Sequence, residues 1–133
     1  MPGEKGDIIV FQLIKRRKDL THQQFKDYWV NNHNKIEREI VNVGKRKKII
    51  AHFVKGIVTG PGQIKETEDL PFDGILELHF DSIEDWKASL QPEVFARLAE
   101  DEKNFISQEK DEEGLMSRTT FVLEEYIMAE RAK

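Results

Sequence analysis

The sequence predicts an α+β fold in which a four-stranded antiparallel sheet carries its helices on one face. Two patterns lead to this prediction. Four segments of strand length are rich in β-branched and aromatic residues, and stretches with helical periodicity separate the first strand from the second and the third from the fourth. A chain of 133 residues is large enough for one hydrophobic core, so we expect a single domain over residues 1–133.

The longest predicted helix covers the stretch from Leu20 to Ile40, ends near residues 42–44 and carries an aromatic face. The residues that share this face recur at three- and four-residue spacing: Phe25, Tyr28, Trp29, Asn32, His33, Ile36 and Ile40. Thr21 is placed to cap the first turn, and Gln24 stands where the partner of a capping box belongs. His33 is on this face, and a histidine titrates near neutral pH, which makes His33 the first candidate for proton-transfer chemistry.

The remaining elements follow in order along the chain. Strands are predicted at residues 8–14, 49–59, 74–80 and 119–128, and helical segments at 82–90 and 92–99. Gly56 indicates a bulge or bend in the second strand, and the polar residues 63–71 predict a loop. The third strand alternates, so that Gly74, Leu76, Leu78 and Phe80 form one apolar face. The resulting β-α-β-β-α-β order is the split βαβ, or ferredoxin-like, arrangement.

Helices can cover only one face of such a sheet. The opposite face carries Ile75 and further apolar side chains of the first strand, and these also need cover. We therefore expect a homodimer in which a second copy of the chain packs against the open sheet face.

Composition and charge exclude several classes of function. The net charge of -4 provides no general attraction for nucleic acid, and the short basic run at residues 45–48 is expected to be a solvated turn. Without cysteine there are no disulfides, no thiolate catalysis and no cysteine-bound metal, which fits a cytoplasmic setting. No apolar run approaches a membrane span, and the start of the chain does not have the pattern of a signal peptide.

Four stretches of the chain resemble the EthD family of the dimeric α/β-barrel superfamily. They are Leu-Thr-x-x-x-Phe-x-x-Tyr-Trp-x-x-x-His at residues 20–33, Phe-Asp-Gly-Ile-Leu-Glu-Leu-His-Phe-Asp-Ser at 72–82, Asp-Glu-x-x-Phe-Ile at 101–106 and Phe-Val-Leu-Glu-Glu at 121–125. The resemblance implies a ferredoxin-like protomer that dimerises through its sheets and holds a ligand between sheet and helices. Similar fungal proteins include cofactor-free decarboxylases and dehydratases of aromatic polyketide pathways.

His33 and Asp73 are the candidate catalytic residues. A histidine on the buried face of a helix can donate or accept a proton near neutral pH, although it can also be a core histidine bonded to a backbone carbonyl. Asp73 precedes the third strand, where it is either a turn residue or a carboxylate that orients His33.

Aromatic residues provide the candidate substrate-binding surface. Tyr28, Trp29 and Phe53 are expected to form flat walls for an aromatic substrate, although such residues more often belong to a core. His52 reaches either the same site or the dimer interface, because Gly56 leaves the register of its strand open.

Neither a metal nor a nucleotide cofactor is predicted. The four histidines show no helical pairing and no HExxH pattern, and the chain has no glycine-rich phosphate loop. Together with what the resemblance to the EthD family implies, this leads to the hypothesis of a cofactor-independent tailoring enzyme of secondary metabolism. It would decarboxylate or dehydrate a small hydrophobic, aromatic polyketide-type substrate, with His33 as general acid/base. The alternatives are a cofactor-free oxygenase or cyclase of such a pathway, and a non-catalytic dimeric binding protein.

Overall fold

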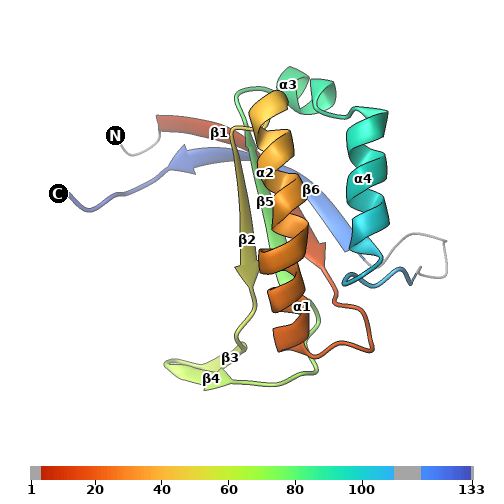
Figure 1. Cartoon of the computed structure of the whole chain (residues 1–133). Coiled ribbons are helices and arrows are strands. Elements are labelled where there is room, and N and C mark those ends of the chain that lie inside the picture. Colours follow the sequence, from red (N-terminus) through yellow and green to blue (C-terminus); the bar gives the residue numbers. More distant parts are fainter. Residues whose placement is uncertain (1–3, 110–117, 133) are drawn as a thin grey trace.

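The computed structural model describes residues 4–109 and 118–132, and it confirms the predicted fold class. Its four-stranded antiparallel sheet has the order β2-β5-β1-β6, and the helices lie on one side of it (Figure 1). The strands of the sheet are β1 (Glu4–Ile14), β2 (Lys48–Phe53), β5 (Gly74–Phe80) and β6 (Arg118–Ile127). The helices are α1 (His22–Tyr28), η1 (Trp29–His33), α2 (Asn34–Val43), α3 (Ile83–Ala88) and α4 (Pro92–Glu102).

Strand pairing assigns the two faces of the sheet. Val10 of β1 is paired with Leu78 of β5, and Leu78 is in turn paired with Ile49 of β2. Successive side chains of a strand point to opposite faces, so these residues share the face under the helices. Phe80, at the end of the same apolar row, is completely buried. The predicted alternation of the third strand is thereby confirmed.

The long predicted helix is continuous but contains a π-helical turn. Residues 29–33 form η1, and the N–H of Asn34 donates to the carbonyl of Trp29, five residues earlier. The predicted capping box is confirmed, because the backbone N–H of Gln24 donates to Thr21 Oγ1 at 3.1 Å and the backbone N–H of Thr21 donates to Gln24 Oε1 at 2.8 Å.

This turn changes which residues are buried beyond it. Asn32, which was expected on the buried face, is exposed, whereas Glu37 is only 7% exposed. A π turn holds one residue more than an α turn, so the residues after it no longer follow the 3.6-residue period that starts at Phe25.

The second predicted strand is shorter than expected. β2 ends at Phe53, and the chain then forms a separate two-stranded hairpin of β3 (Ile57–Gly60) and β4 (Gln63–Lys65), so the predicted loop 63–71 begins as a strand. Gly56 is required where the chain enters this hairpin, because a Cβ there would lie 2.7 Å from the carbonyl oxygen of Lys65. The hairpin projects from one end of the molecule (Figure 1).

An aromatic cluster fixes the first helix on the sheet. Phe25, Trp29 and Phe105 are buried together, and the rings of Phe25 and Trp29 meet edge to face with centroids 5.7 Å apart. Gly74 permits this close approach, because a Cβ at that position would lie 3.0 Å from the Trp29 ring. Burying three large aromatic side chains is worth several kcal/mol, on the order of 2 kcal/mol each.

The second half of the fold follows the prediction closely. Ser82 caps α3 by accepting from the N–H of Asp85 at 3.1 Å, and Pro92 stands in the first turn of α4. The acid-rich stretch 100–113, which the sequence predicts to be partly loop, lies outside the described residues from 110 onward. None of the helices in the described part of the chain has the length and apolar character of a membrane span.

Candidate active site

A cavity of about 330 Å³ lies between the sheet and the helices. Its wall is mainly apolar and comes from Val10, Ile40, Ile49, Leu76, Leu78, Trp86, Leu90, Phe95, Leu98 and Ala99. Six polar or charged side chains also line it: Gln12, His33, Glu37, Arg46, Glu102 and Thr120. This volume is at the lower end of the range for small-molecule sites, and an apolar wall with a few polar groups is typical of them.

His33 is buried in the wall of this cavity, on the π turn. Its side chain is 4% exposed, and Nδ1 lies 2.8 Å from Oδ2 of Asp101 in α4. Because an ionised carboxylate can only accept, Nδ1 carries the proton and Nε2 carries the lone pair. In the described part of the chain Nε2 has no hydrogen-bond partner, so it is the ring nitrogen available to a ligand.

Asp101 is the centre of a small hydrogen-bond network. Its other oxygen, Oδ1, accepts from the hydroxyl of Tyr28 at 2.7 Å, and Asn104 Nδ2 donates to that hydroxyl at 3.0 Å. Burial alone would raise the pKa of Asp101, but the hydrogen bonds from Tyr28 and His33 outweigh it and hold the pKa below its ordinary value. Asp101 therefore stays ionised and fixes the orientation of the imidazole.

Glu37 is the second titratable group of the cavity wall, and the sequence analysis missed it. Indole Nε1 of Trp29 donates to both carboxylate oxygens, at 3.1 and 3.2 Å. Burial raises the pKa of Glu37, against opposing effects of His33 and the indole hydrogen bond, and the charge of Glu102 raises it further. A carboxyl group in this environment tends to keep its proton, so Glu37 can act as a proton donor.

Arg46 also differs from the sequence-based expectation. The basic run at 45–48 was expected to be solvated, yet Arg46 is 7% exposed and lines the cavity. Its neighbour Lys47 behaves as expected of a surface residue, pairing with Asp7 at 2.7 Å and Asp81 at 3.0 Å.

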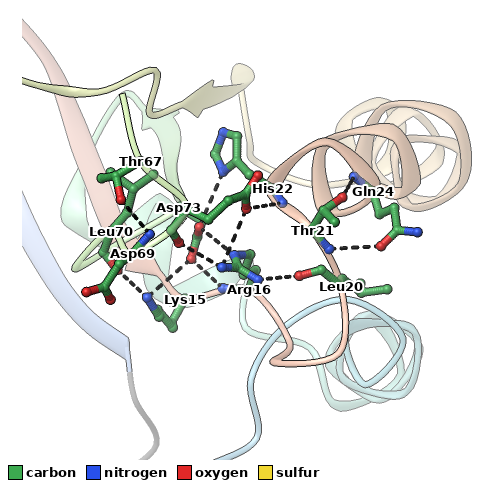
Figure 2. Close-up of polar contacts among 11 residues, drawn as sticks. Lys15, Arg16, Leu20, Thr21, His22, Gln24, Thr67, Asp69, Leu70 and Asp73 are labelled. Carbon is green, nitrogen blue, oxygen red and sulfur yellow. Dashed lines mark hydrogen bonds and ion pairs between the residues drawn. The ribbon is translucent and has the colours of Figure 1, made fainter. Parts of the chain in front are cut away.

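The predicted contact between Asp73 and His33 is not formed, because Asp73 holds together the chain segments beside the start of α1 (Figure 2). The carboxylate of Asp73 is fully buried and accepts from the backbone N–H of Arg16 and from Arg16 Nε, both at 3.0 Å. Nδ1 of His22 lies 3.3 Å from Oδ1, and Lys15 Nζ lies 3.8 Å from Oδ2. Asp101, near the end of α4, takes the orienting position that was assigned to Asp73.

The expected aromatic walls of the site are also placed elsewhere. Tyr28 and Trp29 hold Asp101 and Glu37 by hydrogen bonds, and Phe53 packs edge to face on Trp29 with centroids 5.5 Å apart. None of these three residues lines the 330 Å³ cavity. The rings therefore support the polar groups, and aliphatic side chains form most of the wall.

His52 lies on the opposite face of the sheet. Its register partner on β5 is Ile75, and its Nε2 lies 2.9 Å from Oε1 of Glu77. The other oxygen of Glu77 contacts Nε2 of His79, whose Nδ1 lies 2.8 Å from Asp7. These polar groups thus satisfy one another on the open face, away from the cavity. Among the described residues there is no group of three or more His, Asp or Glu side chains that could hold a metal ion.

Comparison with known proteins identifies relatives of the chain. Residues 17–109 match the model of the EthD domain. A crystal structure of an ethyl tert-butyl ether D (EthD) family protein from Bacillus halodurans C-125 is similar, with a TM-score of 0.60 and 18% sequence identity over 90% of this chain and 99% of the other. At this identity the likeness concerns the fold. A search of curated proteins found no match.

Proposed function

This chain belongs to the EthD domain family, and from that premise we propose that it is a cofactor-independent lyase that acts on an aromatic polyketide-type substrate in secondary metabolism. The observation that carries the proposal is the pairing of two proton-transfer groups, His33 and Glu37, in the wall of one apolar cavity. The two groups have different environments. Nε2 of His33 has no hydrogen-bond partner among the described residues while Nδ1 contacts the ionised Asp101, and Glu37 has a raised pKa.

Such a pair suits the dehydration of a β-hydroxy ketone. Nε2 of His33 takes the proton next to the carbonyl, the electron pair forms the new double bond, and the hydroxyl group leaves as water with the proton of Glu37. Asp101 stabilises the imidazolium that forms. His33 then returns its proton to Glu37 through solvent or through the released water, and the cycle closes without any change of oxidation state.

Decarboxylation of a β-keto acid uses the same groups in a simpler way. The bond to the carboxylate breaks, its electron pair moves toward the ketone oxygen, and Glu37 or protonated His33 supplies the proton. The apolar wall favours the loss of charge from the carboxylate. Both reactions therefore need a proton donor beside a carbonyl group, and the cavity offers one.

Turnover of a substrate panel tests the proposal. We would incubate the protein with aromatic β-hydroxy ketones and β-keto acids and detect the loss of water or carbon dioxide by mass spectrometry. His33→Ala is expected to lower kcat by roughly 100- to 10,000-fold, the usual contribution of a general acid or base. Asn32→Ala is the matched control, because Asn32 is the exposed neighbour of His33 on the same π turn.

The outcome separates the alternatives. Full turnover by a folded His33→Ala variant would remove the proposed mechanism. Oxygen uptake with formation of a quinone would indicate an oxygenase. Binding of the panel compounds without any product would indicate a non-catalytic binding protein.

A further inference from the structure

Arg46 is a buried charge without a partner in the described part of the chain. It lies in the connection between α2 and β2, is 7% exposed and lines the cavity. Within residues 4–109 and 118–132 no group accepts a hydrogen bond or forms an ion pair with its guanidinium, and burial is the sole cause of its lowered pKa. The two cavity carboxyl groups, those of Glu37 and Glu102, form no ion pair with it.

A buried, unpaired guanidinium is costly, and proteins rarely keep one without a use. The desolvation of such a cation disfavours folding strongly unless an anion compensates it. The planar fork of an arginine donates two parallel hydrogen bonds to a carboxylate, and a surrounding apolar wall strengthens the pair by excluding water. No described residue supplies the anionic partner that Arg46 needs. A carboxylate of a bound ligand has the chemistry to do so.

We propose that Arg46 binds a carboxylate of the ligand that fills the cavity, so that the ligand is an aromatic or otherwise apolar organic acid. This inference rests on the proposed function for the choice of an aromatic ligand, and it deepens that function by naming the substrate class. It also assigns Arg46 as a residue that determines specificity.

The proposed salt bridge between Arg46 and the ligand carboxylate, called the anchor below, restricts the reaction that the site carries out. A salt bridge to arginine stabilises a carboxylate in the ground state, and this opposes the loss of that carboxylate as carbon dioxide. The carboxylate at Arg46 therefore serves to bind the substrate and is still present in the product. The group that reacts lies at His33 and Glu37, where water or a different carboxyl group is lost.

A matched pair of ligands tests the anchor. Naphthoic acid and its neutral carboxamide have nearly the same size and shape and differ in charge, and their binding to the full chain is measured by isothermal titration calorimetry. The wild type is expected to prefer the acid by roughly tenfold to a hundredfold, the usual contribution of a charge-assisted pair. Arg46→Met should abolish this preference, and Arg46→Lys should retain part of it. Lys45→Met is the control, since Lys45 is an exposed neighbour of the same charge.

Each outcome bears on the inference. A wild type that binds both compounds equally, or binds neither, would overturn it, and so would an Arg46→Met variant that keeps the preference. Thermal unfolding of Arg46→Met verifies that the variant is folded. The comparison of acid and carboxamide on the wild type tests the proposal even if the variant does not fold. An acid preference that depends on Arg46, in a protein that converts none of the panel substrates, would support the anchor and contradict the proposed lyase activity.

Discussion

Glu37 and Asp101 both interact with His33, and their pKa values are shifted in opposite directions. Burial raises the pKa of Glu37, whereas hydrogen bonds from Tyr28 and His33 lower that of Asp101 in spite of its burial. Two carboxyl groups with separated pKa values around one imidazole allow an acid and an oriented base to coexist at neutral pH. At the scale of single residues, this difference in environment is the property that makes the cavity wall reactive.

The Glu37→Gln variant tests whether the pKa of Glu37 is raised, through the pH dependence of the free energy of unfolding. In the wild type the raised pKa means that the folded state holds the proton more tightly than the unfolded chain, so stability is lost as the pH rises above the ordinary value of 4.5. Glutamine cannot ionise, and its amide oxygen can still accept from Trp29. The variant should therefore gain free energy of unfolding relative to the wild type as the pH rises from 4.5 toward neutrality.

Urea unfolding at a series of pH values measures this difference. Glu39→Gln is the control, because Glu39 is exposed on the same helix and its side chain is 61% accessible. A difference between Glu37→Gln and the wild type that does not change with pH would show that Glu37 ionises normally.

Asp101→Asn tests the positioning of His33. An asparagine side chain can present either its oxygen or its NH2 group to Nδ1, and it carries no negative charge. The imidazole therefore loses its fixed tautomer and the stabilisation of its protonated form. We expect kcat to fall by roughly 10- to 100-fold with little change in KM, as for other groups that orient a reactive side chain. Steady-state kinetics of this variant are compared with those of Glu100→Gln, an exposed neighbour on α4. A raised KM at constant kcat would instead assign Asp101 to substrate binding.

The π turn η1 is the structural element that builds the site. It carries His33 in the cavity wall and brings Glu37 onto the buried face, where Ile40 also lies. A π turn behaves as one residue inserted into an α-helix, and such turns are frequent at functional sites. Removing one residue from this turn should restore a regular α-helix, and the residues after the turn should still present the same face to the core.

Two single-residue deletions test this interpretation. Deleting the exposed Asn31 should leave thermal stability nearly unchanged and abolish turnover, because His33 is displaced while the buried face is kept. Deleting Glu39, which is also exposed, should rotate Ile40 off the core by about 100° and cost about 2 to 4 kcal/mol. Circular dichroism and thermal unfolding of both variants measure the contrast. Equal loss of stability in the two would show that η1 is not an inserted residue.

The sequence predicts the elements of this fold better than it predicts the site. Alternation in Gly74–Phe80 and the capping box at Thr21 are local patterns, and both are confirmed. The π turn has no signal in residue type, so a regular 3.6-residue period places Asn32 inside and leaves Glu37 out. Asp101 reaches His33 from α4, and Arg46 reaches the cavity from the connection between α2 and β2, and no local pattern links either residue to His33.

At the scale of the whole molecule, one face of the sheet has no helices. Phe121 and Leu123 of β6 are 46% and 39% exposed and are paired with Phe11 and Ile9 of β1, which places them on that open face. The histidine and carboxylate groups on β5 and β2 are already paired there, so covering the face leaves few unsatisfied charges. We therefore keep the prediction of a homodimer through this surface.

Analytical ultracentrifugation tests the dimer. The wild type is expected to sediment as a dimer, and the double variant Phe121→Glu with Leu123→Glu as a folded monomer, because two carboxylates would be buried without partners. Val58→Glu is the control, since Val58 is 72% exposed on the hairpin, outside the open face. A monomeric wild type would contradict the prediction.

The buried guanidinium of Arg46 also bears on directed evolution. In a library selected for heat resistance alone, replacements of Arg46 by apolar residues should be among the first to accumulate, because they remove a buried charge that has no partner among the described residues. The selected proteins would have higher thermal stability and would have lost ligand binding and activity. Positions enriched in such a selection would then outline the ligand site without any knowledge of the ligand.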